Sequence, residues 1–384
     1  MAGVVVLVLL VVGGGGTAIW RAMNKPAKAK TTTTTAAAKC ASGTLAVLGP
    51  TSGNPDEIGP ASVNMAKLAS QEYAAAHPGC TVTIRAFDSQ GDKTKALPLA
   101  KEIIADPTIL GVVGPLYSKE TAAVAPVLSK AGIPMISSSA SGVNVGEEGL
   151  KTFHRTVGSD ADSGVAIAKY IKSTNPSAKA FVVDDGSDYA LHAADAARES
   201  LGAMVVNTAV IKEDQTTGLS DLATQIKNSG ATVIAFAGFS AEAAALRKAV
   251  NAAGGSNIDL VAGPGLLDTV YVTETGEAGK DTIVVCACMP GAGLPEDFKN
   301  KLTAKSETKP GAYVGEAYDA ANALIAGLAA GKRTRADLNT FLSTYSATGV
   351  TGQISFEAGG NRRVVPQWYF VVGTDGFFGK SPIQ

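Results

Sequence analysis

The chain has 384 residues and a formal net charge of −1, and a chain of this length usually forms more than one domain. Aromatic residues make up 6% and charged residues 17%, and no basic stripe is interleaved with aromatic side chains, which argues against nucleic acid as a partner. The 43 glycines and the 46% hydrophobic fraction are typical of a compact α/β protein with many tight turns. Its binding partner is expected to be small and not a polyanion.

Residues 1–24 are expected to form a transmembrane anchor or a signal segment. An apolar stretch covers residues 4–20, just long enough to span a bilayer or to form the core of a signal peptide. No basic residue precedes this stretch, and four follow it: Arg21, Lys25, Lys28 and Lys30. This distribution would keep the following domain in the cytoplasm. Because the rest of the chain indicates export, we expect a missing basic extension or a translocated domain that overrides the charge bias.

Residues 25–42 are expected to be a low-complexity tether, since they show no hydrophobic periodicity and contain a run of threonines. Cys40 stands near the end of this tether. Its lipidation is not expected, because the charged Lys39 precedes it and the apolar stretch ends far upstream.

From residue 43 onwards, short apolar strands alternate with helices. The first half is expected to contain strands at 44–48, 81–87, 111–113 and 134–136, and helices at 60–76, at 94–105 and after residue 117. The second half is expected to contain helices at 160–173, 190–201, 219–228 and 241–253, with strands at 180–183, 203–210, 232–236 and 259–262. Such alternation predicts parallel sheets covered on both faces.

The last third is expected to contain a strand at 282–286, helices at 296–304, 313–330 and 335–345, and a hairpin-like pair of strands with a Gly-Gly turn.

The segment 111–141, GVVGPLYSKETAAVAPVLSKAGIPMISSSAS, brings two polar groups to one edge of the predicted sheet. Ser118 opens a helix, whose free backbone N–H groups favour an anion. Four serines crowd the end of the following strand: Ser137, Ser138, Ser139 and Ser141. Ligands of parallel sheets bind at the carboxyl ends of strands, so the two groups predict a small-molecule site. The alternative is that these serines only cap their elements.

An enzyme is not predicted. The chain has three histidines, and it has no GxSxG elbow after a strand, no HExxH motif and no Walker lysine. Asp184 and Asp185 are adjacent on one strand, so their side chains would point to opposite faces. No cofactor and no metal site are predicted.

The four cysteines fall into two pairs. Cys40 precedes the first strand and Cys80 begins the second. These strands are neighbours in a doubly wound sheet, so a Cys40–Cys80 disulfide is expected, and with it an oxidising compartment. Cys286 and Cys288 lie two residues apart on one face of a predicted strand. With no second Cys/His pair beside them, they are interpreted as buried small hydrophobic residues and not as metal ligands.

The segment 111–141 resembles the core of the type I periplasmic binding proteins, specifically the group that binds branched-chain amino acids and amides. The similarity extends from about residue 43 to the C-terminal end. It implies an α/β fold of two doubly wound parallel-sheet lobes, joined by three crossings, with a ligand cleft between them. The expected boundaries are lobe 1 at 43–157, lobe 2 at 158–280, a return to lobe 1 at 281–350 and C-terminal strands crossing to lobe 2 at 351–384.

The same resemblance implies which residues bind the ligand. Ser118, Ser139 and Ser141 would hold an α-carboxylate and help with the α-ammonium of an amino acid. Hydroxyls at a helix N-terminus suit a carboxylate on chemical grounds as well. Tyr189 and Phe239 match aromatic residues of the second lobe, and Tyr313 is a third candidate, although each aromatic alone is more often ordinary packing.

The sequence departs from the family pattern where an acid would pair with the ligand ammonium, because that position is Gly265. Removing the counter-charge of a buried ion costs about 3–5 kcal/mol. Either another acid replaces it, with Asp160, Asp185 and Asp268 as candidates, or the ligand is not an α-amino acid. The family also includes binders of amides, urea and aromatic acids.

The resemblance therefore implies an extracytoplasmic solute-binding protein. It would capture a small carboxylate-bearing ligand by lobe closure, deliver it to the permease subunits of an ABC importer, and be secreted or tethered to the membrane by its N-terminal segment. Two alternatives remain open: a membrane-anchored sensing ectodomain, and a wall-attached structural protein with a vestigial cleft.

Overall fold

The computed structural model describes residues 40–53, 57–143, 149–267, 269–373 and 376–383. The expected anchor or signal segment (1–24) and nearly all of the expected tether (25–42) lie outside these residues. In the described part of the chain, no helix combines the length and the apolar character that crossing a membrane requires.

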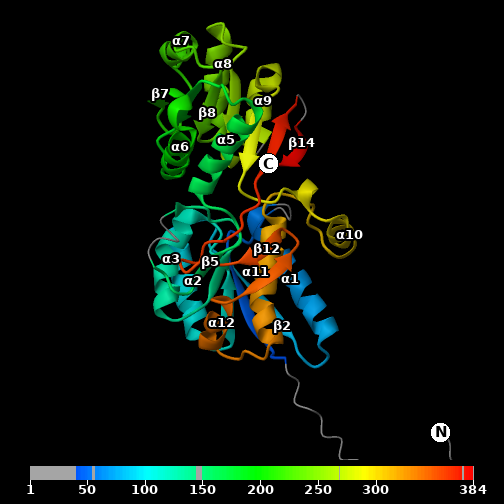
Figure 1. Cartoon of the computed structure of the whole chain (residues 1–384). Helices are drawn as coiled ribbons and strands as arrows, with labels where there is room; N and C mark the ends of the chain where they lie inside the picture. The colour runs from blue at the N-terminus through cyan, green and yellow to red at the C-terminus, as the bar shows by residue number, and fades with distance from the viewer. Residues whose placement is uncertain (1–39, 54–56, 144–148, 268, 374–375, 384) are drawn as a thin grey trace, which may run out of the picture. The chain divides into compact units, whose positions relative to one another are not determined.

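The first sheet contains five strands in the order β2-β1-β3-β4-β5, all parallel. They are β1 (Gly43–Gly49), β2 (Val82–Asp88), β3 (Ile109–Val113), β4 (Met135–Ser137) and β5 (Phe153–Arg155). Its helices are α1 (Ile58–Ala76), α2 (Lys93–Ala105), α3 (Ser118–Lys130), α11 (Val314–Ala329) and α12 (Arg335–Leu342). In Figure 1 the orange helices α11 and α12 lie among these blue and cyan elements, although they come late in the chain.

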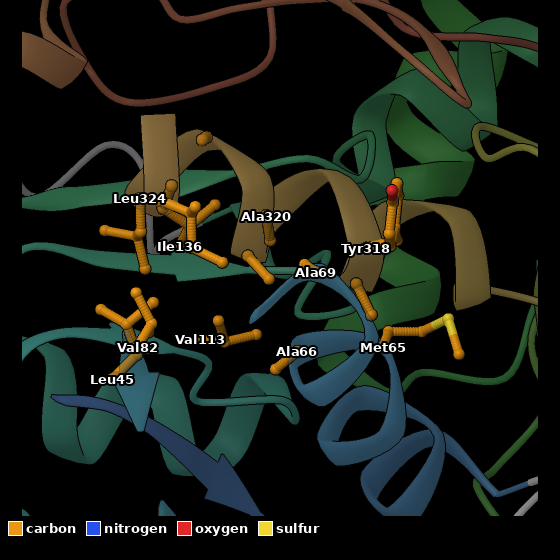
Figure 2. Packing of buried hydrophobic residues seen from close by; sticks show 14 of the residues in the cluster. Leu45, Met65, Ala66, Ala69, Val82, Val113, Ile136, Tyr318, Ala320 and Leu324 are labelled. Carbon is orange, nitrogen blue, oxygen red and sulfur yellow. The ribbon is translucent and has the colours of Figure 1, made fainter. Parts of the chain in front are cut away.

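The central strands β1 and β3 are buried on both faces, which explains their continuous apolar sequences. On β1, Leu45 and Val47 pack with α1 and α11, whereas Ala46 and Leu48 pack with α2 and α3. Figure 2 shows the first of these layers, in which small residues of α1 let that helix approach α11. The layer also explains Gly111 on β3, because a Cβ there would lie 2.9 Å from Leu324.

The second sheet contains seven strands in the order β14-β13-β10-β9-β8-β6-β7. They are β6 (Ala180–Asp184), β7 (Val205–Val210), β8 (Val233–Ala237), β9 (Asp259–Ala262), β10 (Ile283–Cys286), β13 (Trp368–Val372) and β14 (Phe377–Pro382). Its helices are α5 (Asp160–Thr174), α6 (Asp188–Leu201), α7 (Ser220–Asn228), α8 (Ser240–Ala252) and α9 (Thr269–Thr275). One face packs on α5 and α6 and the other on α7, α8 and α9.

Two features of this sheet differ from the sequence expectations. The sheet is mixed and not wholly parallel, because β13 pairs antiparallel with both β10 and β14. In addition, the expected return to the first lobe at residue 281 comes too early. Residues 283–286 form β10, which pairs with β9 through Ile283 and Val284. Because β10 is paired with β9 on one side and with β13 on the other, the chain leaves this sheet only after Cys286.

The remaining elements lie outside the two sheets and their covering helices. They are α10 (Glu296–Lys305), the hairpin of β11 (Ser346–Gly349) and β12 (Gly352–Ser355), and the 3₁₀ turns η1 (Gly202–Met204), η2 (Pro264–Leu266), η3 (Gly276–Gly279) and η4 (Gly291–Gly293). The expected Gly-Gly turn closes only a single bridge, between Phe356 and Arg362.

The chain passes between the sheets three times, and the three crossings meet at Gly158. The first crossing joins β5 to α5, the second follows β10, and the third precedes β13. The Gly158 N–H donates to the Ala287 carbonyl at 3.0 Å. A Cβ on Gly158 would lie 2.7 Å from both the Ala287 Cβ and Val365 Cγ1. Only glycine therefore lets the crossings approach so closely.

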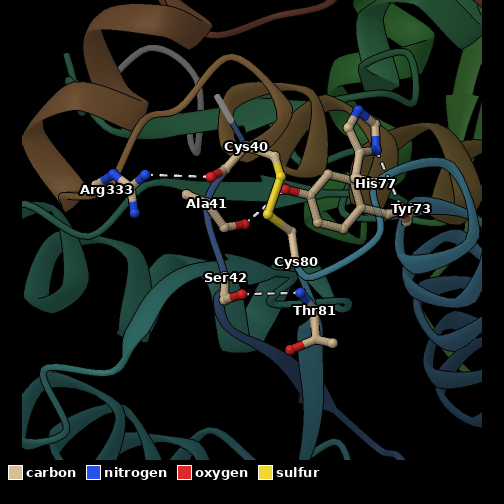
Figure 3. The surroundings of a disulfide bond; sticks show 8 residues. All are labelled: Cys40, Ala41, Ser42, Tyr73, His77, Cys80, Thr81 and Arg333. Carbon is tan, nitrogen blue, oxygen red and sulfur yellow. Dashed lines mark hydrogen bonds between the residues drawn. A yellow bond between two sulfur atoms is a disulfide. The ribbon is translucent and has the colours of Figure 1, made fainter. Parts of the chain in front are cut away.

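The structure contains two disulfides. Cys40 and Cys80 are joined, with their Cα atoms 6.3 Å apart, and fix the start of β1 beside β2 (Figure 3). Cys286 and Cys288 are also joined, so they are not the separate apolar side chains that the sequence suggests. The strand ends at Cys286, and the bend that follows brings the two sulfurs together. Their Cα atoms are 5.1 Å apart, compared with about 6.5 Å for alternate residues of an extended strand.

Candidate functional site

The serines predicted to bind an anion lie beside each other but make different bonds. Ser118 is the first residue of α3, and its Oγ accepts a hydrogen bond from the Gly142 N–H at 3.0 Å. Ser139 donates its hydroxyl proton to the Leu116 carbonyl at 2.7 Å. The Ser118 hydroxyl donates to no described residue and so has a proton for a ligand, whereas Ser139 uses its proton to hold the loop.

Arg155 supports this serine loop and was not among the predicted residues. It is 1% exposed, and its guanidinium donates to the Gly142 carbonyl at 2.8 Å and to Asn361 Oδ1 at 2.9 Å. A charged residue within a short buried strand is the sequence signal that could have identified it, because a buried charge needs partners.

Asp160 connects the serine loop to the second lobe. It begins α5 and is 3% exposed, and its N–H donates to the Ser141 carbonyl at 2.9 Å. Burial raises the pKa of the Asp160 carboxyl to about 6, against the lowering effects of a hydrogen bond with the Ser141 side chain and of the Arg155 charge. Its Oδ1 atom is buried and has no hydrogen-bond partner among the described residues. An acid with an unsatisfied oxygen beside a serine loop is suited to a cationic or donor group.

Of the three predicted aromatic residues, Tyr189 and Tyr313 are affected by the charge of Asp160. The rings of Tyr189 and Phe239 lie 5.5 Å apart, and Phe239 is 43% exposed. Burial, and then the charge of Asp160, raise the pKa of the Tyr189 hydroxyl well above its usual range. Tyr313 precedes α11 in a left-handed conformation, with φ of 62°. Burial, Glu316 and Asp160 all raise its pKa. The charge of Asp160 thus contributes to the raised pKa of two of the three predicted aromatic residues.

The expected acid at position 265 could not be accommodated by this backbone. A Cβ on Gly265 would lie 2.2 Å from the Gly238 carbonyl oxygen and 3.4 Å from Phe239. At neighbouring Gly263, a Cβ would lie 2.4 Å from the Tyr189 hydroxyl. The space that an acidic side chain would need is therefore occupied by the backbone and by the aromatic pair.

Asp185 and Asp268 are the other two candidates for pairing with the ligand ammonium. Asp185 is fully buried and accepts three hydrogen bonds, from the Ser187 N–H and hydroxyl at 3.0 and 2.6 Å and from the Phe239 N–H at 3.0 Å. Its carboxylate therefore fixes the starts of α6 and α8. Asp268 lies outside the described residues. Asp160 is the candidate acid that the structure places with both the serine loop and the aromatic residues.

A buried charged network lies next to this site, where the crossings meet. Glu316 on α11 accepts a hydrogen bond from the Met289 N–H of the second crossing at 2.6 Å, and burial raises its pKa to about 7. Arg362 donates to the Thr156 carbonyl of the first crossing at 2.8 Å and to the Thr351 carbonyl at 2.8 Å. These contacts tie the crossings to the first lobe.

Known proteins are similar to this chain in sequence over most of its length. The family model of the periplasmic binding proteins matches residues 43–376. A Leu/Ile/Val-binding protein homolog of Brucella melitensis is 26% identical over 347 residues, which cover 85% of this chain and 93% of that protein. The Leu/Ile/Val-binding protein of Escherichia coli K12 is 24% identical over 331 residues, covering 83% and 87%.

Solved structures share the fold. The branched-chain amino acid transporter substrate-binding protein LivJ of Streptococcus pneumoniae, in complex with isoleucine, aligns with a TM-score of 0.73 at 24% identity and covers 89% of this chain and 99% of its own. A solute-binding protein of R. palustris in complex with benzoate aligns with a TM-score of 0.68 at 19% identity, covering 88% and 95%. With a family match over most of its length, the chain belongs to the periplasmic binding protein family.

Proposed function

We propose that the chain is an extracytoplasmic solute-binding protein that captures a branched-chain or related α-amino acid and delivers it to an ABC importer. The observation that carries the proposal is Asp160, a buried acid that is hydrogen-bonded to the serine loop and whose charge acts on Tyr189 and Tyr313. The names of the relatives support the same ligand class.

The carboxylate of the ligand is assigned to the start of α3. Ser118 retains its hydroxyl proton, and the first backbone N–H groups of a helix favour negative charge. A hydrogen bond to a charged group contributes roughly 1.5–3 kcal/mol. Arg155 holds the loop in place by binding its carbonyls and does not need to touch the ligand.

The ammonium of the ligand is assigned to Asp160. With a pKa of about 6, this carboxyl is mostly ionised at pH 7. Its buried Oδ1 atom can accept a hydrogen bond that no described residue supplies. Asp160 would thus take the role that Gly265 cannot perform, and the counter-charge would come from the start of α5.

The ligand side chain is assigned to Tyr189, Phe239 and Tyr313, which offer apolar ring surface. Ser118 belongs to the first lobe, whereas Tyr189 and Phe239 belong to the second. A ligand that contacts both lobes favours the state in which they are close together. The closed state would be the form of the protein that the permease recognises.

We also infer export, with residues 1–24 as signal or anchor and the following segment as tether. Two disulfides in the described chain fit an oxidising compartment. The apolar stretch at residues 4–20 fits either form of export.

A second candidate ligand is an aromatic or other carboxylic acid without an ammonium group. The absence of an acid at position 265 favours it, as does the aromatic pair that fills the space there. The benzoate bound by the R. palustris structural neighbour shows that this fold can hold such a ligand.

A thermal-shift screen of the full chain in mild detergent separates these candidates. The ligands tested are the amino acids leucine, isoleucine and valine, together with 4-methylpentanoate and benzoate. 4-Methylpentanoate is leucine without its ammonium group. A ligand at 100 times its Kd adds about 2.7 kcal/mol to the free energy of unfolding. The amino acids should raise the melting temperature and 4-methylpentanoate should not. A shift with benzoate or 4-methylpentanoate alone would replace the amino acid assignment by the second candidate.

A further inference from the structure

The Cys286–Cys288 disulfide lies where the second sheet ends and the second crossing begins. Cys286 is the last residue of β10, and Cys288 is two residues further on. Both are buried, at 1% and 0% exposure. The bridge therefore spans the bend where β10 ends, and its cysteines belong to a small buried cluster separate from the larger cores.

The residues next to the sulfurs bind the other parts of this region. Ala287, between the two cysteines, accepts the hydrogen bond from the Gly158 N–H of the first crossing at 3.0 Å. Met289, just after the bridge, donates its N–H to Glu316 on α11 at 2.6 Å. The path of residues 286–289 thus decides whether both hydrogen bonds can form at once.

The bridge also contacts the candidate ligand site. Cys286 and Cys288 form one buried cluster with Val157 of the first crossing and Phe370 of β13, and Tyr313 packs against this cluster. Tyr313 is one of the two tyrosines whose pKa the charge of Asp160 raises. A change in the bend at Ala287 would therefore reach the ligand site through one side chain.

The two disulfides should act differently, because a bridge stabilises a protein chiefly by restricting its unfolded chain, and this effect grows with the length of the closed loop. Cys40–Cys80 spans a sequence separation of 40 residues, and Cys286–Cys288 spans a separation of 2. The short bridge restricts the unfolded chain least. What it fixes is the native bend.

From these contacts we infer that the Cys286–Cys288 disulfide is a positioning element for ligand binding. It holds the second crossing in the bend that lets Ala287 and Met289 make their hydrogen bonds, and it supports Tyr313 against the ligand. The inference rests on the proposed function for the identity of the ligand, but not for the contacts of the bridge.

The test compares two double variants of the full chain, with alkylation and intact mass confirming which bridge remains. In Cys286→Ala/Cys288→Ala, calorimetry should show at least a tenfold weaker affinity for L-leucine, or for benzoate if only benzoate binds the wild type. The melting temperature should fall less than in the matched control, Cys40→Ala/Cys80→Ala. That control should bind within twofold of the wild type. Wild-type affinity in the Cys286/Cys288 variant would overturn the inference.

A second measurement does not need a bound ligand or a folded variant. Mild reduction of the wild-type protein, adjusted to open the short bridge alone, is followed by amide hydrogen exchange. The amides of Gly158 and Met289 should exchange at least tenfold faster, while amides of β1 should not change. Unchanged exchange at both crossings would overturn the inference. If neither L-leucine nor benzoate binds the wild type, the ligand assignment fails, and this exchange result still decides the role of the bridge.

Discussion

Asp160 and Ser141 are joined by a backbone hydrogen bond. The Asp160 N–H donates to the Ser141 carbonyl at 2.9 Å, and the Ser141 side chain lowers the pKa of the Asp160 carboxyl, against the larger rise caused by burial. The first residue of the first helix of the second lobe is thus fixed to the serine loop of the first lobe. This contact gives Asp160 a defined position beside the groups assigned to the ligand carboxylate.

Replacing Asp160 by Asn should abolish the preference for an ammonium-bearing ligand. Leaving the ligand cation without its counter-charge costs about 3–5 kcal/mol, which corresponds to at least a hundredfold weaker binding of leucine. Titration calorimetry with leucine and with 4-methylpentanoate measures the effect. The Asp160→Asn variant should bind 4-methylpentanoate no worse than the wild type does. Equal loss for both ligands would show that Asp160 acts on the fold and not on the ammonium.

The same acid should make leucine binding depend on pH. The Asp160 carboxyl has a pKa raised to about 6, so its charge is present above pH 6 and is lost as the pH falls through that value. Leucine affinity should be constant from pH 7 to 8 and fall roughly tenfold for each pH unit well below 6. The Asp160→Asn variant should show no such decline. A wild-type affinity that stays level down to pH 5 would contradict the assignment.

Substitution of Ser118 and of Ser139 should distinguish the serine that binds the ligand from the serine that stabilises the loop. Ser118→Ala should weaken ligand binding by about 1.5–3 kcal/mol, because a hydrogen bond to a charged carboxylate is lost. Ser139→Ala removes the bond to the Leu116 carbonyl, so it should lower the free energy of unfolding by about 1 kcal/mol and leave affinity within threefold. Calorimetry and urea unfolding of both variants measure the two effects. The reverse pattern would assign the ligand contact to Ser139.

Glu316→Gln should remove one part of the pH dependence of stability. The pKa of Glu316 is raised from 4.5 to about 7, so the folded chain keeps a proton that the unfolded chain has released between these values. This contribution to stability is complete below about pH 4.5, declines as the pH rises to 7, and amounts to on the order of 3 kcal/mol. Urea unfolding from pH 5 to 8 should show that the wild type loses stability relative to the Gln variant as the pH rises. A constant difference would exclude Glu316 as its source.

Gly158→Ala should disturb the point where the crossings meet. Its Cβ would lie 2.7 Å from Ala287 and Val365, and overpacking of this kind costs about 1–3 kcal/mol. Gly311→Ala is the matched control, since its Cβ would meet nothing closer than 3.8 Å. Urea unfolding should place the control within about 0.5 kcal/mol of the wild type. Equal stability of the two variants would mean that the crossings can separate without cost.

Much of the fold was predictable because its signals are local. Continuous apolar strands alternating with helices predict buried parallel sheets, and β1, β6 and β8 are buried over most or all of their length. The position of β10 was not predictable in the same way. An apolar strand such as Ile283–Cys286 fits either sheet, and only its pairing with β9 and β13 decides between them.

For the candidate site, the sequence predicts the types of residue present better than it predicts the contacts that they make. The sequence predicts polar groups at strand ends, but it does not show that Ser139 uses its proton on Leu116 or that Asp185 is fully bonded. Arg155 was missed because its partners, the Gly142 carbonyl and the Asn361 side chain, come from other parts of the chain and form no local pattern with it. The bond between Cys286 and Cys288 depends on a bend after the strand, which period-2 spacing cannot reveal.

The distance along the chain from Gly158 to Asp160 is two residues, and this short distance has a mechanical consequence. A group close to an axis of rotation moves little when the bodies on either side turn. In the proposed closure, Asp160 would keep almost the same place beside Ser141, whereas Phe239, at the start of α8, would sweep through a wider arc. The charge of the ligand would then be recognised before the lobes move. Selection for the size and shape of the ligand side chain would occur only as the two lobes come together.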